Sequence, residues 1–332
     1  MKLYIHQHKA TILAGILFFS LACLIAIADR APLHSEKPVP GTGMRENFQQ
    51  YYDGMINQTQ PGPYVYRVLI PYAIKFVKAV FTALDIIFID LVFKIIILTA
   101  YQLLFFLFLV RFFPSREAVY GVLWLDLLLA YSLSTVYGPS IGETMDLFNA
   151  AIFCVALLAL FHELYGIFYL ILFIGMMNRE TPLFLIPLPA VVGLYSAQSV
   201  RRSAIAFLAA IVPYVAIRMA ISGDSPVWFT AEAIGRNIPF LSPERTMNAL
   251  VANLHLILLL GPLVILTLYK FKEHPAFLQR IVVIVPIFII VHYIVASIIE
   301  ARLWMPVFIL LIPPAMNTLR LIFSNDVVKR FT

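Results

Sequence analysis

Apolar runs close to the ~20 residues that a helix needs to cross a lipid bilayer recur along the whole chain. Of the 332 residues, 61% are hydrophobic and 13% are charged, whereas a soluble domain carries roughly a quarter charged residues. The mean hydropathy is +0.90. Because lipid cannot hydrogen-bond to the backbone, we expect these runs to form helices. The sequence therefore predicts one all-α integral-membrane domain over residues 1–332.

The apolar runs predict a polytopic transmembrane helical bundle of about ten spans. The first run could be a signal peptide, because Ala26-Ile27-Ala28 resembles a cleavage site, but its length and the later spans favour a retained helix. Polar breaks divide residues 147–197 into three short pieces, so two spans plus a half-helix is an alternative there. The expected spans are 10–28, 86–110, 118–136, 147–161, 165–177, 181–197, 203–221, 248–269, 281–299 and 303–320.

The positive charges predict the orientation of the bundle. Residues 66–84 carry Lys75 and Lys78 on one helical face, which favours an interfacial helix over a span. The N-terminus is then cytoplasmic, and basic clusters fall in short cytoplasmic loops, as the positive-inside rule requires. The net charge of +6 reflects these loops, and nucleic acid is not a predicted partner. The loop residues are Lys2, Lys9, Arg111, Arg116, Arg201, Arg202, Lys270, Lys272, Arg280, Arg320, Lys329 and Arg330.

Polar residues gather on the opposite, extracytoplasmic face. They lie in a long first outer loop over 29–65, in an outer loop over 222–247, and in short breaks between spans. A carboxylate at the edge of hydrocarbon is costly unless it is solvated, paired or used in function. The carboxylates of interest at this face are Asp29, Glu46, Asp53, Glu143, Asp146, Glu180 and Glu300.

Two of the short breaks place an arginine near a carboxylate. Arg179 directly precedes Glu180, and neighbouring residues of a helix do not face each other, so we expect them to have different partners. Glu300 and Arg302 can converge on one site if the backbone there is extended. These arginines suit either anchoring at the headgroup level or binding of a phosphate, which matches the planar guanidinium fork.

Ionisable residues also lie inside the apolar runs. Asp90 and Lys94 are four apart, a spacing that favours a local ion pair. Asp126 has no such neighbour and needs a partner from another helix, either for function or as a structural hydrogen bond. The histidines show no metal-binding spacing, and Cys23 and Cys154 lie in apolar runs, so we predict neither a metal site from them nor a disulfide.

The stretch ENFQQYYDGMINQTQPGPYVYRVLIP, residues 46–71, combines carboxylates, tyrosines and one arginine in the first outer loop. Pro61-Gly62-Pro63 forms a turn, because this tripeptide continues neither a helix nor a strand. Arg67 then stands where the chain re-enters apolar sequence. The tyrosines, Tyr52 and Tyr66 among them, suit either an interfacial aromatic belt or a platform that stacks on a sugar ring.

This arrangement resembles the GT-C superfamily of integral-membrane glycosyltransferases. The resemblance covers the general layout, the loop followed by PYxYRxLxP, the segment NRETPLFLIP, and ExRxxxP near the last span. It implies a polyprenyl-phosphate-linked sugar as donor and a place in the bacterial inner membrane, among envelope-assembly proteins. Many members carry adjacent acidic residues in the first loop, whereas the acids here are isolated. The resemblance therefore assigns no metal ligands and no cofactor, and leaves a divalent metal open.

The resemblance also implies roles for the outer-face residues. A carboxylate, Glu46 or Asp53 with Asp29 in reserve, would act as general base on an acceptor hydroxyl. Arginines at the membrane edge would stabilise the charge of the leaving lipid phosphate. The substrate-binding candidates are Tyr52, Tyr66, Arg67, Glu143, Asp146, Arg179, Glu180, Glu300 and Arg302.

Two other functions are compatible with the sequence. A membrane transporter or lipid flippase would use polar residues at mid-membrane on broken helices, and Asp126 and the proline-rich run 181–197 fit that pattern. A catalytically inactive subunit of a polysaccharide-assembly complex fits the isolated acids of the first loop. All three interpretations have membrane lipid as a partner.

Overall fold

The computed structural model describes residues 2–30, 44–57, 59, 66–133, 143–221, 234, 237–238 and 246–331. The side chains of 2–12, 29–30, 44–49 and 324–331 lie outside this description. Every regular element in the described ranges is a helix. The elements are α1 (Lys2–Arg30), α2 (Met44–Ile56), α3 (Leu69–Val80), α4 (Ile86–Leu109), α5 (Ser115–Leu133), α6 (Glu143–Phe161), α7 (Tyr165–Met176), η3 (Thr181–Leu185), α8 (Leu188–Val192), α9 (Ala197–Ala220), α11 (Thr246–Leu268), η5 (Phe271–Glu273), α12 (Ala276–Val282), α13 (Ile284–Val295), η6 (Ala301–Trp304) and α14 (Met305–Phe331).

Six helical segments in the described part of the chain are long and apolar enough to cross a membrane. Shorter apolar helices cover 13–28, 165–176 and 181–192. These segments confirm an integral-membrane type of all-helical fold. The six are Ile86–Leu109, Glu143–Phe161, Ala197–Ala220, Thr246–Leu268, Ala276–Val295 and Ala301–Phe323. The expected number of about ten crossings stays a prediction, because shorter helices would have to supply the rest.

The core of the bundle is built around α6. This helix packs against α4, α7 and α14, and 78% of its most apolar 18-residue stretch is buried. Helix α9, by contrast, packs mainly on α7 and α8, and only 17% of its most apolar 18-residue stretch is buried. Its outward side chains, such as Phe207 and Met219, are apolar and exposed, as expected for a helix that faces lipid.

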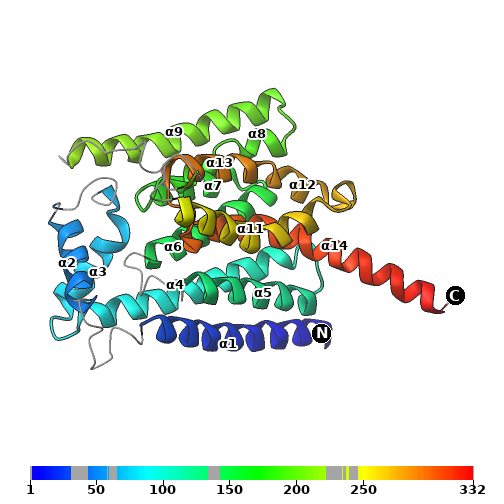
Figure 1. The fold of residues 1–332 in the computed structure, drawn as a ribbon, viewed down its shortest axis with the longest axis horizontal. Coiled ribbons are helices and arrows are strands. Elements are labelled where there is room, and N and C mark those ends of the chain that lie inside the picture. Colours follow the sequence, from blue (N-terminus) through cyan, green and yellow to red (C-terminus); the bar gives the residue numbers. More distant parts are fainter. Residues whose placement is uncertain are drawn as a thin grey trace.

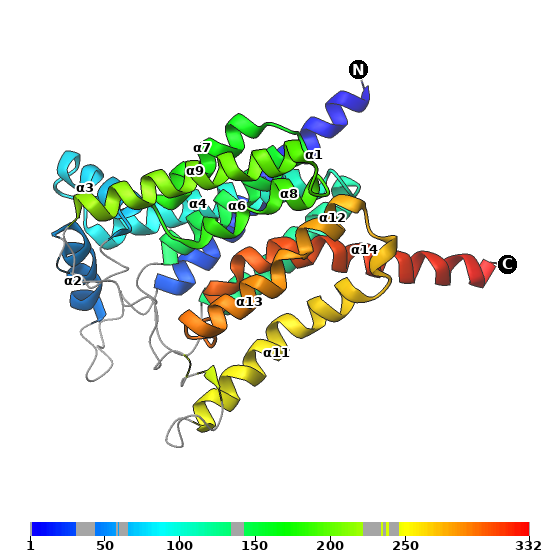
Figure 2. The same cartoon turned by 90° about the horizontal axis from the view of Figure 1, so that it is seen from above.

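The helices run roughly lengthwise, and α2 and α3 lie together at one end of the bundle (Figure 1). Both chain termini lie at the opposite end, which the view from above also shows (Figure 2). Because α4 begins beside α3 and runs away from it, the turn over 110–114 that leads to α5 lies at the end that carries the termini. Arg111 and Arg116 therefore lie at the opposite end from α2 and α3.

Several predicted segments are shorter or more interrupted in the structure than the sequence indicates. The expected interfacial helix 66–84 is α3, which covers only Leu69–Val80. The expected span 181–197 consists of η3 and α8, which end at Val192, because prolines at 182, 187 and 189 remove backbone donors. The expected span 281–299 begins earlier, with α12, and is interrupted at Val283 before α13.

Candidate functional site

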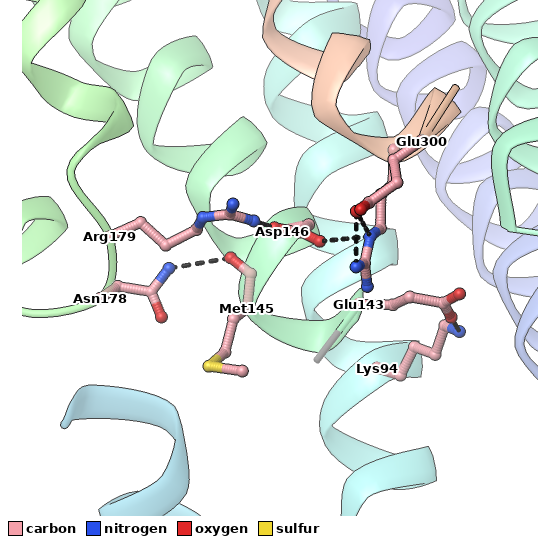
Figure 3. A network of polar contacts seen from close by, with 8 residues as sticks. Lys94, Glu143, Met145, Asp146, Asn178, Arg179 and Glu300 are labelled. Atoms are coloured by element: carbon pink, nitrogen blue, oxygen red, sulfur yellow. Dashed lines mark hydrogen bonds and ion pairs between the residues drawn. The ribbon is translucent and has the colours of Figure 1, made fainter. Parts of the chain in front are cut away.

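Asp146 stands at the centre of a cluster of charged side chains (Figure 3). It lies in the first turn of α6, at the end of the bundle that carries α2 and α3 (Figure 1). Its Oδ1 forms an ion pair with Arg179 Nη1, and its Oδ2 lies 3.5 Å from Arg302 Nε. Arg302 also donates to Glu300 Oε2 from Nε at 3.1 Å and from Nη2 at 2.8 Å. We call Asp146, Arg179, Glu300 and Arg302, together with Arg67, the arginine cluster.

Local structure places each member of the cluster. Asp146 and Glu143 lie in the first turn of α6, where the helix dipole stabilises negative charge. Arg179 lies in the break between α7 and η3, and Asn178 fastens this break to α6 by donating to the Met145 carbonyl at 2.8 Å. Arg302 belongs to η6, immediately before α14. The cluster therefore joins segments that are far apart in the sequence.

Two guanidinium groups of the cluster, those of Arg67 and Arg302, act electrostatically on the third, that of Arg179. Burial lowers the pKa of Arg179, and the positive charges of Arg67 and Arg302 lower it further, to about 9. Arg179 is thus still protonated at neutral pH. Its Nε is buried and makes no hydrogen bond within the described structure. Arg67 is 9% exposed, so it too is held out of bulk solvent.

A second group of buried polar side chains lies between α2, α4 and α6. Lys94 of α4 forms an ion pair with Glu143 of α6 at 2.6 Å, and both side chains are almost completely buried. Asp90 Oδ1 accepts hydrogen bonds from the Tyr52 hydroxyl at 2.5 Å and from Thr144 at 2.8 Å. Glu143 also acts electrostatically on Arg302, so this group adjoins the arginine cluster.

Arg218, in the last turn of α9, forms a third group at the same end. Its Nη2 donates to Glu180 Oε1 at 2.8 Å. Its guanidinium carbon lies 3.6 Å from the ring centroid of Tyr214 and 4.5 Å from that of Tyr66. Planar stacking on two aromatic faces together with an ion pair is a use of arginine that lysine cannot reproduce.

All nine predicted substrate-binding residues belong to one of these three groups. Arg179 and Glu180 have different partners, as expected from their adjacency, and Arg302 pairs with Glu300, as the extended backbone allows. Tyr52 is buried, and its hydroxyl donates a hydrogen bond to Asp90. The residues that share the three groups are Tyr52, Tyr66, Arg67, Glu143, Asp146, Arg179, Glu180, Glu300 and Arg302.

Of the three predicted catalytic carboxylates, only the side chain of Asp53 is described, and it belongs to none of these groups. Asp53 is exposed on α2, whereas its neighbour Tyr52 is fully buried, so the Asp53 side chain points outward from the bundle. The side chains of Glu46 and Asp29 lie outside the described residues. The role of Glu46 and Asp29 therefore stays a prediction from the sequence, which places Glu46 in α2 and Asp29 at the end of α1.

Sequence reasoning missed Arg218 and the bond between Lys94 and Glu143. Arg218 follows Tyr214 by four residues at the end of an apolar helix, and this aromatic–cation spacing could have indicated it. The i,i+4 spacing of Asp90 and Lys94 predicts a local pair, and the structure shows that Lys94 also bonds to Glu143, 49 positions away. Asp126 does find a partner on another helix, as expected, because Gln102 of α4 donates to it at 2.7 Å.

No group of three or more His, Cys, Asp or Glu side chains in the described residues could hold a metal ion. No family model, no curated protein and no solved structure matches the chain. The function therefore has to be inferred from the geometry of the three groups.

Proposed function

We propose that this protein is a membrane glycosyltransferase that moves a sugar from a polyprenyl-phosphate donor to an acceptor at the extracytoplasmic face. One observation carries the proposal. Three guanidinium groups come from three distant segments: those of Arg67 and Arg302 act electrostatically on that of Arg179, and Arg179 and Arg302 share the carboxylate of Asp146. Like charges repel, and the carboxylates of Asp146 and Glu300 beside these groups offset part of that repulsion.

A lipid phosphate is the anion that this setting fits best. The guanidinium fork matches phosphate oxygens, and its charge acts more strongly where water is excluded. The buried Nε of Arg179 offers a donor that the described protein atoms do not use. The exposed apolar faces of helices such as α9 give a lipid tail a hydrocarbon environment next to the cluster.

Asp146 and Glu300 orient the arginines in this proposal. Asp146 contacts both Arg179 and Arg302, and Glu300 accepts two hydrogen bonds from Arg302. The guanidinium groups are then fixed before substrate binds, which is how preorganised donors stabilise charge on a leaving group. The acidic residue that removes a proton from the acceptor would come from the first outer loop: Glu46 or Asp53, with Asp29 in reserve. A positioned carboxylate typically contributes about 10²–10⁴-fold to the rate.

The proposal includes a topology. The chain would cross a bacterial inner membrane about ten times, with a cytoplasmic N-terminus and α3 at the outer interface. Support comes from charge: the turn between α4 and α5, whose sequence holds Arg111, and the start of α5, which holds Arg116, lie at the end opposite α2 and α3, as do the two termini. Helix α3 buries Ile70 and Ile74 while Phe76 and Phe81 remain exposed near Lys75, a pattern that suits the headgroup region.

The experiment is transfer from polyprenyl-phosphate-linked sugars by purified protein in liposomes. Arg302→Ala should lower the rate by about 10²-fold or more, the usual effect of losing one donor to a developing charge. Arg320→Ala is the matched control, because Arg320 is 52% exposed and only loosely paired with Glu117. Equal rates for wild type and Arg302→Ala would remove the proposal, as would the absence of transfer from every donor tested.

A transporter is the second candidate, and interrupted helices favour it. The segments 181–192 and 276–295 are each broken near their middle, and broken helices line binding sites in many transporters. The buried ion pair of Lys94 and Glu143 is the kind of group that such a site uses. Accumulation of a labelled solute in proteoliposomes, without sugar transfer, would favour this function over the first.

A further inference from the structure

Arg218 links three segments that surround the arginine cluster. It projects from the last turn of α9, stacks between the rings of Tyr214 and Tyr66, and forms an ion pair with Glu180. Its positive charge also complements the negative end of the α9 dipole. Tyr66 belongs to the re-entry segment before α3, and Glu180 belongs to the break after α7. One side chain thus holds both segments to α9.

The residues that Arg218 holds are the sequence neighbours of two cluster arginines. Tyr66 is followed by Arg67, and Glu180 is preceded by Arg179. In each segment one residue contacts Arg218, and the arginine adjacent to it in the sequence contributes its guanidinium group to the cluster. A displacement of the backbone at Tyr66 or Glu180 therefore also displaces the backbone of the adjacent cluster arginine, because adjacent Cα atoms are a fixed ~3.8 Å apart.

The backbone joins the same two segments directly. The amides of Val68 and Leu69 both donate to the Met177 carbonyl, at 3.1 and 3.2 Å. These amides belong to the start of α3, where a helix leaves its first N–H groups without internal partners. A small apolar group of Tyr66 and Ile221, with Val68 and Ile217 against it, covers this joint. Arg218 therefore lies beside a joint at which these two backbone hydrogen bonds and this small apolar group meet.

We propose that Arg218 is a positioning residue: it sets the separation of Arg67 and Arg179, and hence the fit of the arginine cluster to a phosphate. The role in phosphate binding rests on the function proposed above, whereas the clamping of the Val68–Leu69 joint does not. Arg218 acts through Tyr66 and Glu180 and need not touch the ligand.

The chain offers a matched control on the same helix. Arg202, near the start of α9, lies 3.8 Å from the ring centroid of Tyr165 and donates to its hydroxyl at 2.8 Å. This contact ties α9 to α7 at the other end of the helix, away from the arginine cluster. Arg202→Ala therefore removes a comparable cation–aromatic contact without touching the joint.

Hydrogen–deuterium exchange of the ligand-free protein tests the clamp. In Arg218→Ala the peptide that contains Val68 and Leu69 should exchange at least about tenfold faster, whereas Arg202→Ala should leave it unchanged. Arg218→Lys should fall between, because it keeps a charge for Glu180 but loses planar stacking. Should Arg218→Ala fail to fold, Tyr214→Ala takes its place, with Tyr214→Phe as the variant that keeps the ring. Unchanged exchange, or equal acceleration in Arg202→Ala, overturns the proposal.

Binding of undecaprenyl phosphate, measured in nanodiscs against uncharged undecaprenol, tests the consequence for the cluster. Arg218→Ala should weaken binding of the phosphate by about tenfold, with partial recovery in Arg218→Lys and none of the loss in Arg202→Ala. Faster exchange together with wild-type affinity would show that the joint does not position the cluster, which overturns the inference. If the wild type does not prefer the phosphate to the alcohol, the proposed function fails, while the exchange result still decides the clamp.

Discussion

The buried ion pair between Lys94 and Glu143 should be among the most costly contacts to break in this protein. The two charges are 2.6 Å apart, and the side chains are 0% and 1% exposed. At an effective dielectric constant of about 20, charges at that distance attract by about 6 kcal/mol before desolvation is counted. Replacing one of the two residues leaves the charge of the other in the interior without this ion pair, which typically lowers the free energy of unfolding by about 3–5 kcal/mol.

The double substitution should cost much less than the sum of the two single ones. Lys94→Met and Glu143→Leu each leave a buried charge, but together they leave an apolar pair of similar volume. We expect a coupling free energy of at least about 2 kcal/mol, which is the size seen for residues in one buried network. Arg320 and Glu117 give the control, because this pair is exposed and 4.0 Å apart, so its coupling should stay below about 1 kcal/mol.

The measurement is a double-mutant cycle on the free energy of unfolding, with the protein in bicelles and unfolding followed by a reversible steric-trapping assay. Additive effects within about 0.5 kcal/mol at Lys94 and Glu143 would refute the reasoning, because independent sites add and coupled ones do not. Equal coupling in the exposed pair would also refute it, since burial would then make no difference.

Two further substitutions test how the polar end of the bundle is held. Tyr52→Phe removes the 2.5 Å bond to Asp90 and should lower the free energy of unfolding by about 1.5–3 kcal/mol, measured in the same assay. Gly175→Ala should destabilise by about 1–3 kcal/mol, because its new Cβ would lie 2.8 Å from Cγ of the rigid Pro182 ring, whereas Gly166→Ala meets nothing within 4 Å and should be neutral or stabilising. A neutral Tyr52→Phe, or equal effects at the two glycines, would contradict these expectations.

The membrane character of the fold could be predicted from the sequence because hydrophobic length is a local property. Adjacent side chains also tend to face different neighbours, and Arg179 and Glu180 do have different partners, although they lie in the break between α7 and η3 and not in one helix. The pairing of Arg302 with Glu300 is also local. These are statements about neighbours along the chain, and the structure confirms them.

Contacts between distant segments could not be predicted in this way. Lys94 has a carboxylate one helical turn away, yet its bond to Glu143 depends on α6 packing against α4, which no local spacing encodes. Arg218 lies inside an apolar helix that the sequence presents as an ordinary span, and its role depends on where the 66–69 segment docks. Asp53 was favoured for its place in a polar loop, but the burial of Tyr52 turns it outward.

The account depends on the arginine cluster being a site for the phosphate of a polyprenyl-linked sugar. The most direct test is single-turnover release of polyprenyl phosphate from a panel of such donors by wild type and by the Arg179→Ala/Arg302→Ala double variant in liposomes. We predict release by the wild type with at least one donor, and a loss of about 10²-fold or more in the variant. Release that is absent in the wild type, or equal in both proteins, would contradict the account.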